Sequence, residues 1–134
     1  MIDIENELFT TIATALREAY SGIFVTGEYV RQPAKFPAVS IVEMDNSVYQ
    51  RGVDSADVEQ FANVMYQVDV YSSLNKGRKA QAKAIIALID EQFARLGFIR
   101  NFLNPVPNFD DATIYRMTAR YRAVVSKDNT IYGR

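Results

Sequence analysis

The chain has 134 residues, of which 49% are hydrophobic and 23% are charged, and its formal net charge is −1. This length suits one domain, 1–134, with enough apolar residues for a core. Cysteine and histidine are absent, which excludes disulfides, thiolate or histidine metal ligands, cysteine nucleophiles and Ser-His-Asp triads. Chemistry that uses Asp, Glu, Lys, Tyr or Ser stays open.

The charges are distributed unevenly along the chain. Residues 1–70 contain 11 acidic and 4 basic side chains, whereas residues 71–134 contain 5 acidic and 11 basic ones. This split predicts either two surfaces of opposite sign or oppositely charged strands that lie side by side and cancel. The near-neutral total predicts no general attraction to nucleic acid or acidic membranes.

No targeting segment is visible in the sequence. Acidic residues follow Met1 directly, which is the wrong charge for the start of a signal peptide. The longest apolar run, residues 84–89, is far shorter than the roughly 20 residues of a membrane helix. We therefore expect a soluble protein that is made in the cytosol.

The hydrophobic periodicity predicts two helices and five strands. In chain order they are a helix at 3–20, a strand at 23–26, a loop or arm at 27–37, a strand at 38–44, a polar loop at 45–57, a long strand at 58–72, a helix at 78–96, a strand at 98–103, a proline-containing turn at 104–108 and a strand at 112–125. Residues 126–134 are a polar C-terminal tail that can be flexible. Each helix carries an apolar stripe at helical spacing.

This order, α-β-β-β-α-β-β, indicates an α+β fold. Short turns between consecutive strands favour a mainly antiparallel sheet, and both helices can pack on one of its faces. The opposite face would be solvated or would meet another molecule, because one side of the last strand carries Arg116, Thr118, Arg120 and Arg122.

Two groups of carboxylates are candidates for metal or acid–base chemistry. Glu43 and Asp45 are two residues apart in a strand and, with Asp69, could hold a hard cation. A strand that simply ends in a polar turn explains the same residues and is the favoured interpretation. The loop acids Asp54, Asp57 and Glu59 are better explained as a solvated loop than as a binding site.

A basic cluster precedes and opens the second helix. It consists of Lys76, Arg78, Lys79 and Lys83. The segment is not a P-loop, since its single glycine and its ending do not match that motif. Cations at a helix N-terminus oppose the macrodipole by about 0.3–1 kcal/mol each. A solvated basic turn is the favoured interpretation, followed by a binding site for an acidic protein partner and then by one for a nucleic-acid backbone.

A second basic feature is the stripe formed by Arg116, Arg120 and Arg122 on one strand face. Gln67 and Asp69 on the other long strand could act as cross-strand partners. The stripe therefore predicts either an intramolecular network or a surface that faces another subunit or a lumen.

The chain contains eight tyrosines and eight phenylalanines but no tryptophan. We expect Tyr66, Phe93 and Phe98 in the core. Other aromatic residues fall near loops or element ends, where such side chains often anchor interfaces. These are Tyr49, Phe61, Phe109 and Tyr132.

Four segments together resemble a known family. They are YQVDVYS at 66–72, which leads through the basic turn into the Ala-rich helix, ARLGF at 94–98, NPVP at 104–107 and YRMTARYRAVVS at 115–126. The chain resembles the tail terminator (tail completion) proteins of bacteriophages and prophages with long, non-contractile tails. The similarity is clearest over residues 63–132, about half the chain, and the first half matches mainly in the order of its elements.

The resemblance implies an α+β subunit without catalytic activity or a cofactor. It implies a homo-oligomeric ring, typically a hexamer, that caps the head-proximal end of the tail tube, stops tube growth and joins the tail to a head connector. The implied partners are further copies of the chain, the tail tube protein, the connector and, in the lumen, genome DNA through non-specific contacts. The implied location is the virion neck, after synthesis in the cytoplasm of the host bacterium.

Three alternatives stay open. One is a DNA-contacting protein in which the stripe of Arg116, Arg120 and Arg122 lines a channel, and steeply salt-dependent DNA binding would favour it. Another head–tail connector or minor capsid protein would have a similar sequence pattern. A small nucleotide- or phosphate-binding enzyme would use residues 76–79 and nearby carboxylates, and it would show a pocket with converging polar groups. The residues we expect to bind partners or neighbouring subunits are Lys76, Arg78, Lys79, Lys83, Arg116, Arg120, Arg122, Tyr49 and Tyr132.

Overall fold

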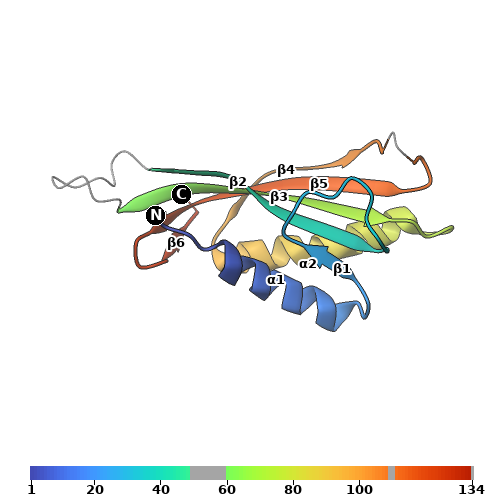
Figure 1. Cartoon of the computed structure of the whole chain (residues 1–134), viewed down its shortest axis with the longest axis horizontal. Helices are drawn as coiled ribbons and strands as arrows, with labels where there is room; N and C mark the ends of the chain where they lie inside the picture. The colour runs from blue at the N-terminus through green and yellow to red at the C-terminus, as the bar shows by residue number, and fades with distance from the viewer. Residues whose placement is uncertain (49–59, 109–110, 134) are drawn as a thin grey trace.

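The computed structural model describes residues 1–48, 60–108 and 111–133. These residues form an α+β domain with two layers, a six-stranded sheet and a pair of helices that lies below it in Figure 1. The predicted fold class is confirmed. The elements are α1 (Glu5–Ala19), β1 (Phe24–Thr26), β2 (Ala38–Val48), β3 (Phe61–Ser72), α2 (Arg78–Leu96), β4 (Ile99–Val106), β5 (Tyr115–Ser126) and β6 (Ile131–Tyr132).

Both helices form where the apolar spacing predicts them. In α1 the side chains of Leu8, Ile12 and Leu16 are buried, four residues apart, and in α2 the buried residues follow the same periodicity. Gly97 ends α2 in the left-handed conformation, with φ of +95°, a conformation that glycine adopts at low cost. The two apolar faces therefore point toward the sheet.

The strands are arranged in the order β1-β2-β3-β5-β4, and β6 also pairs with β5. β1 runs parallel to β2, whereas the other pairs are antiparallel. The chain passes from β3 through α2 to β4 and leaves space between them that β5 later fills. The long central pair of β3 and β5 therefore carries the middle of the sheet.

The core lies between the sheet and the helices. The ring of Phe93 stacks on that of Tyr121, with centroids 4.1 Å apart, and packs edge-on against Phe98 at 5.2 Å. Tyr66 packs against both phenylalanines. The prediction that Tyr66, Phe93 and Phe98 belong to the core is confirmed, since their exposed fractions are 0%, 0% and 7%.

Several strand boundaries differ from the expectation, and β5 begins at Tyr115 instead of residue 112. β2 continues through residues 45–48, which were expected to begin a loop, because β3 is long enough to pair with them. β4 continues through Pro105 to Val106, where a turn was expected. A proline fits there because β4 lies at the edge of the sheet, where one side of the strand needs no donor. The expected flexible tail contains β6, which pairs with Val124 and Val125.

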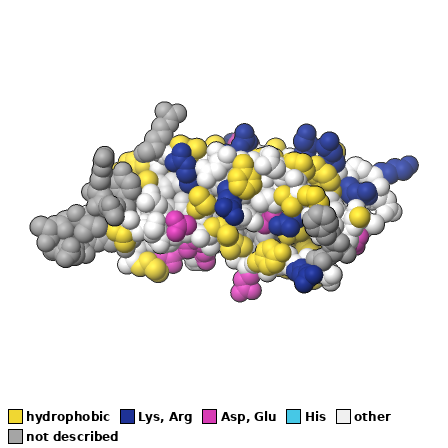
Figure 2. Space-filling view, turned by 90° about the horizontal axis from the view of Figure 1, so that it is seen from above, with side chains coloured by type: hydrophobic (Ala, Val, Ile, Leu, Met, Phe, Trp, Pro, Cys, Tyr) yellow, Lys and Arg dark blue, Asp and Glu magenta, His cyan; other side chains and the backbone are white. Residues whose placement is uncertain are grey.

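Both helices lie on one side of the sheet, and among the described residues no helix or strand covers the other side, which we call the open face. Even-numbered residues of β3 and odd-numbered residues of β5 point toward α2, as Tyr66 and Tyr121 show by contacting Phe93. The side chains of Asp69 and Arg120 therefore point to the open face. Figure 2 views this face and shows lysine and arginine side chains spread among hydrophobic ones.

One end of the open face is buried by the chain itself. The hydroxyl of Tyr71 donates a hydrogen bond to the Val30 carbonyl at 3.3 Å, which ties the arm at 27–37 to β3. Ser40 and Asp69 are 1% exposed although neither faces a helix. The open face therefore divides into a buried part next to the arm and a part, around Met65 and Arg122, over which no described segment lies in this way.

Candidate functional site

Asp69 is the centre of a polar network on the open face. Its Oδ1 accepts a hydrogen bond from the Thr118 hydroxyl and pairs with Arg116, whose Nε lies at 3.0 Å and Nη2 at 2.9 Å. Its Oδ2 accepts a hydrogen bond from Gln67 Nε2 at 3.1 Å. The three donors satisfy a carboxylate that would be very unfavourable if it were buried alone.

The charge on Arg116 is favoured by this arrangement. Partial burial acts to lower the pKa of Arg116, but the neighbouring Asp69 carboxylate outweighs that effect and the pKa is raised. The guanidinium also lies 5.6 Å from the centre of the Tyr71 ring. The phenol of Tyr71 is buried, and burial together with Asp69 raises its pKa to about 12. The guanidinium of Arg116 therefore has its partners, Asp69 and Tyr71, within the same chain.

Arg120 and Arg122 differ from Arg116. Arg120 Nε donates to Gln67 Oε1 at 2.9 Å, and its guanidinium lies 5.7 Å from the centre of the Phe102 ring. Arg122 is exposed. Within the described ranges, neither has a carboxylate within 4.0 Å. The predicted arginine stripe is thus partly an intramolecular network and partly a set of unpaired cations.

Apolar side chains surround these two cations. In the sheet register, Met65 lies opposite Arg122 and Phe102 opposite Arg120. Both apolar residues are half-buried, as are Val42 and Val124 on the same face. Arg120 and Arg122 with Met65 and Phe102 form what we call the arginine patch.

A cluster of acids lies on the opposite side of the sheet. Glu43 faces the helix layer, because it lies opposite Tyr66 and its Oε1 accepts a hydrogen bond from the Tyr66 hydroxyl at 3.3 Å. Asn46 Nδ2 donates to the Ile2 carbonyl at 2.7 Å and thereby holds the N-terminal segment beside β2. Asp3 and Glu5 follow directly in that segment. We call Asp3, Glu5 and Glu43 the acidic cluster.

Asp3 and Glu5 act on the protonation of the Glu43 carboxylate. Burial, the nearby Glu5 and Asp3 raise the pKa of Glu43 above its ordinary value of 4.5, although hydrogen bonds from Tyr66 and Asn46 act in the other direction. No lysine or arginine in the described part of the chain lies within 4.0 Å of these acids. The sequence pattern did not predict this cluster, since Asp3 and Glu5 are far from Glu43 along the chain.

The predicted cation site does not form. A register shift at Met44 turns Glu43 and Asp45 to opposite sides of β2, since they lie opposite Tyr66 and Met65. Asp69 is on the open face and pairs with Arg116. No group of three or more potential metal ligands occurs in the residues that the structure describes. The loop acids at 54, 57 and 59 lie outside the described residues.

The basic cluster at the start of α2 is solvated. Lys76, Lys79 and Lys83 are exposed, and Arg78 Nη1 lies 3.5 Å from the Leu74 carbonyl. Helix α2 has no acidic residue in its first turn and no side-chain cap at Gly77. In Figure 1 this end of α2 lies at the opposite end of the molecule from β6. These cations and the arginine patch are therefore separate features.

Of the aromatic candidates, Tyr132 is 47% exposed and its ring makes an edge contact with Phe61, with centroids 6.2 Å apart. Tyr49 and Phe109 lie outside the described residues. The predicted contact role of Tyr132 stays a prediction.

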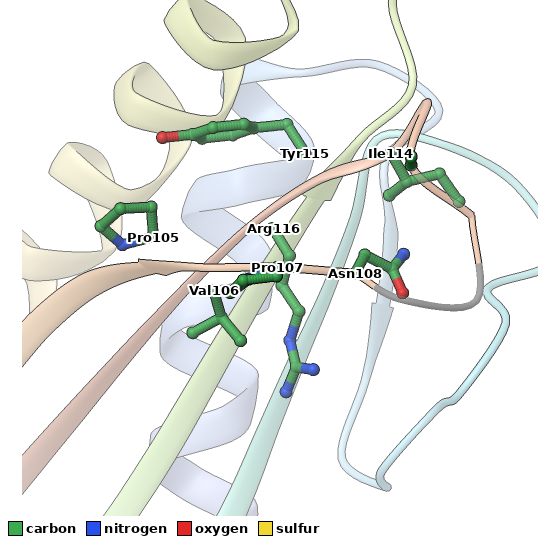
Figure 3. Close-up of a pocket in the computed structure, with 8 residues that line it drawn as sticks. Pro105, Val106, Pro107, Asn108, Ile114, Tyr115 and Arg116 are labelled. Carbon is green, nitrogen blue, oxygen red and sulfur yellow. The ribbon is translucent and has the colours of Figure 1, made fainter.

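A cavity of about 580 Å³ opens where β4 leads toward β5. Its walls are mainly apolar, with Pro105, Pro107, Ile114 and Tyr115 among them. Figure 3 shows the Tyr115 ring and the Arg116 guanidinium directed to opposite sides of the strand. Because Arg116 is engaged by Asp69, this cavity does not bring together the charged groups that phosphate chemistry would need.

No helix in the described ranges combines the length and apolar character that crossing a membrane requires. No protein-family model matches the chain, and a search of curated proteins finds no match. The functional argument therefore depends on the resemblance in sequence, the fold and the two charged surfaces.

Proposed function

We propose that the chain is a structural assembly protein of a bacteriophage tail. It forms a ring at the head-proximal end of the tail tube, ends tube growth and joins the tail to the head. It acts by binding alone. Its partners are further copies of itself, the tail tube protein and a connector at the head.

The observation that carries the proposal is the run of four similar segments between residues 66 and 126. They are a continuous part of the fold: YQVDVYS lies in β3, ARLGF covers the end of α2, NPVP covers the end of β4, and YRMTARYRAVVS is β5. The similarity thus includes the central strand pair and the helix packed beneath it. The α+β fold is the one that the resemblance implies.

The charge distribution supports the proposal independently. A ring built from identical subunits needs two different, complementary surfaces on each subunit. The arginine patch and the acidic cluster lie on opposite sides of the sheet, and neither forms an ion pair with a side chain of the described residues. An enzyme would instead need polar groups that converge on one site.

The proposal is tested with tail tubes purified from the phage or prophage that encodes the chain. Tubes assembled in the presence of the protein should be shorter and uniform in length, and gold-labelled protein should mark one end of each tube in electron micrographs. Binding along the tube wall, or tubes whose length does not change, would refute a terminator. Binding only to the purified connector would favour another neck protein.

A further inference from the structure

The arginine patch is an incomplete surface. Arg120 and Arg122 are unpaired by carboxylates in the described part of the chain, and they stand among half-buried apolar side chains such as Met65 and Phe102. Gln67 and the Phe102 ring hold Arg120 in one orientation before any partner arrives. Fixed cations beside apolar area are typical of protein interfaces, where arginine is enriched.

The acidic cluster is the complementary surface on the same chain. The Asn46 side-chain amide donates to the Ile2 carbonyl at 2.7 Å and to Glu43 Oε1 at 3.4 Å, so the segment that carries Asp3 and Glu5 lies beside Glu43. No lysine or arginine of the described residues forms an ion pair with these acids, and the like charges of Asp3 and Glu5 repel the ionised Glu43 carboxylate. A cationic partner would relieve this repulsion.

The two surfaces cannot meet within one molecule. Glu43 faces the helix layer, whereas Arg120 and Arg122 project from the open face of the same sheet. One neighbour cannot contact both sides of a sheet at once, so each copy must use two neighbours. Such a contact joins different patches, head to tail, and closes into a ring when the rotation per subunit allows.

The strand edges are poorer candidates for this contact. On the outer edge, β4 carries an irregularity between Arg100 and Phe102 and includes Pro105. β2 has its own register shift beside Met44. Bulges and proline are features that discourage strand addition from another chain. A contact between the open face of one copy and the helix side of the next is therefore favoured over a sheet that continues from one copy into another.

We propose that the arginine patch binds the acidic cluster of a second copy of this chain, and that this head-to-tail contact is the subunit interface. The inference depends on the proposed ring and specifies its interface. In it, Arg122 of one copy faces the end of α1 that carries Glu5 in the next copy. Met65 and Phe102 lose their remaining exposed surface in the same contact.

Charge reversal at the two exposed positions tests the interface. Arg122→Glu and Glu5→Lys should each weaken self-association about tenfold or more, because attraction is replaced by repulsion. The assembly state is measured by analytical ultracentrifugation over a range of protein concentrations. Lys127→Glu is the matched control, since it makes the same charge change at an exposed loop residue and should leave assembly unchanged.

The decisive measurement combines the two substitutions, first in one chain and then as a mixture of the two single variants. The double variant Arg122→Glu/Glu5→Lys should assemble again, because every contact then pairs the reversed charges. An equimolar mixture of the two single variants should also assemble, since reversed and native contacts alternate around the ring. Thermal melting of each variant separates a lost contact from a lost fold, and recovery in the mixture excludes misfolding directly.

The outcomes separate this inference from the proposed function. Rings that form equally well with either single reversal, or double variants and mixtures that stay dissociated, would overturn the interface but leave tube capping intact. A wild-type chain that stays monomeric at all concentrations would also overturn it. A chain whose assembly follows the charge-swap pattern but that fails to cap tail tubes would confirm the interface and refute the terminator.

Discussion

Asp69 is 1% exposed, and its carboxylate forms an ion pair with Arg116. It also accepts hydrogen bonds from Thr118 and Gln67. The period of two along β3 and β5 indicated that these side chains share a face. The prediction that Asp69 and Gln67 act as cross-strand partners of the arginines is confirmed for Arg116 and Arg120. The network orders Arg116 and Gln67, and Gln67 in turn orders Arg120. The buried carboxylate of Asp69 therefore fixes the orientation of Arg116 directly and that of Arg120 through Gln67.

Asp69→Ala should lower the free energy of unfolding by about 2–4 kcal/mol, because it leaves the half-buried Arg116 and Thr118 without their acceptor. Asp69→Asn is the matched control. It keeps the size and one acceptor oxygen but loses the charge, so its loss should be smaller. Urea unfolding followed by circular dichroism measures both. Equal stability of Asp69→Ala and the wild type would contradict the network.

Glu43 makes stability depend on pH. Its pKa is raised in the folded chain above the ordinary 4.5, so folding favours the protonated form. The stability that the protonated Glu43 carboxyl contributes is fully present below pH 4.5. It is lost as the pH rises through the raised pKa of Glu43 in the folded chain. At neutral pH the ionised carboxylate therefore destabilises the fold.

Glu43→Gln should therefore raise the Tm near about pH 7, and its advantage over the wild type should shrink as the pH falls toward the ordinary carboxylate pKa. Differential scanning calorimetry at several pH values measures this. Glu7→Gln, at an exposed position in the first turn of α1, is the control and should give a smaller change. If the Tm difference between Glu43→Gln and the wild type increased as the pH fell, the raised pKa of Glu43 would be contradicted.

At the scale of elements, the helices followed their sequence pattern more closely than the strands did. Predicted α2 has the observed boundaries, because an apolar stripe and Gly97 define it locally. β2 and β4 are longer than predicted because pairing with β3 and β5 extends a strand over polar residues or Pro105. Strand ends depend on a partner far away in the sequence.

The end of α2 offers a test at this scale. Gly97 has φ of +95°, and its N–H and that of Phe98 donate to the Ala94 and Phe93 carbonyls at 3.1 and 2.9 Å. Gly97→Ala should cost about 1 kcal/mol of stability, because alanine is strained in this conformation. Gly27→Ala is the control, since Gly27 has no positive φ and an added Cβ would make only ordinary contacts. Chemical denaturation that gave equal losses would contradict this account of the α2 end.

At the scale of the whole molecule, the uneven charge along the sequence becomes charge on two sides of one sheet. The acids at residues 3, 5 and 43 gather on the helix side, and Arg120 and Arg122 stand on the open face. Part of the opposite charge cancels within the sheet, as in the Asp69–Arg116 pair. The cancellation of charge between neighbouring strands is therefore observed, whereas two surfaces of opposite overall sign stay a prediction.

An interface between these two sides should be sensitive to salt. Raising the ionic strength from about 0.05 M to about 0.5 M shortens the range of charge interactions severalfold and should shift the assembly toward smaller species. Analytical ultracentrifugation at a fixed protein concentration measures the shift. Assembly that strengthened with salt would indicate a contact dominated by apolar area.

The sequence pattern predicted the α+β class, the two helices, the order of the elements from α1 to β5 and the aromatic core around Phe93, because hydrophobic periodicity and helix ends are local properties. The tertiary structure decided that β5 lies between β3 and β4, that the arm at 27–37 buries one end of the open face, and that Glu43 joins Asp3 and Glu5. Strand order, register and the shift at Met44 depend on packing between distant segments. The acidic cluster depends on that shift, which turns Glu43 and Asp45 to opposite sides of β2.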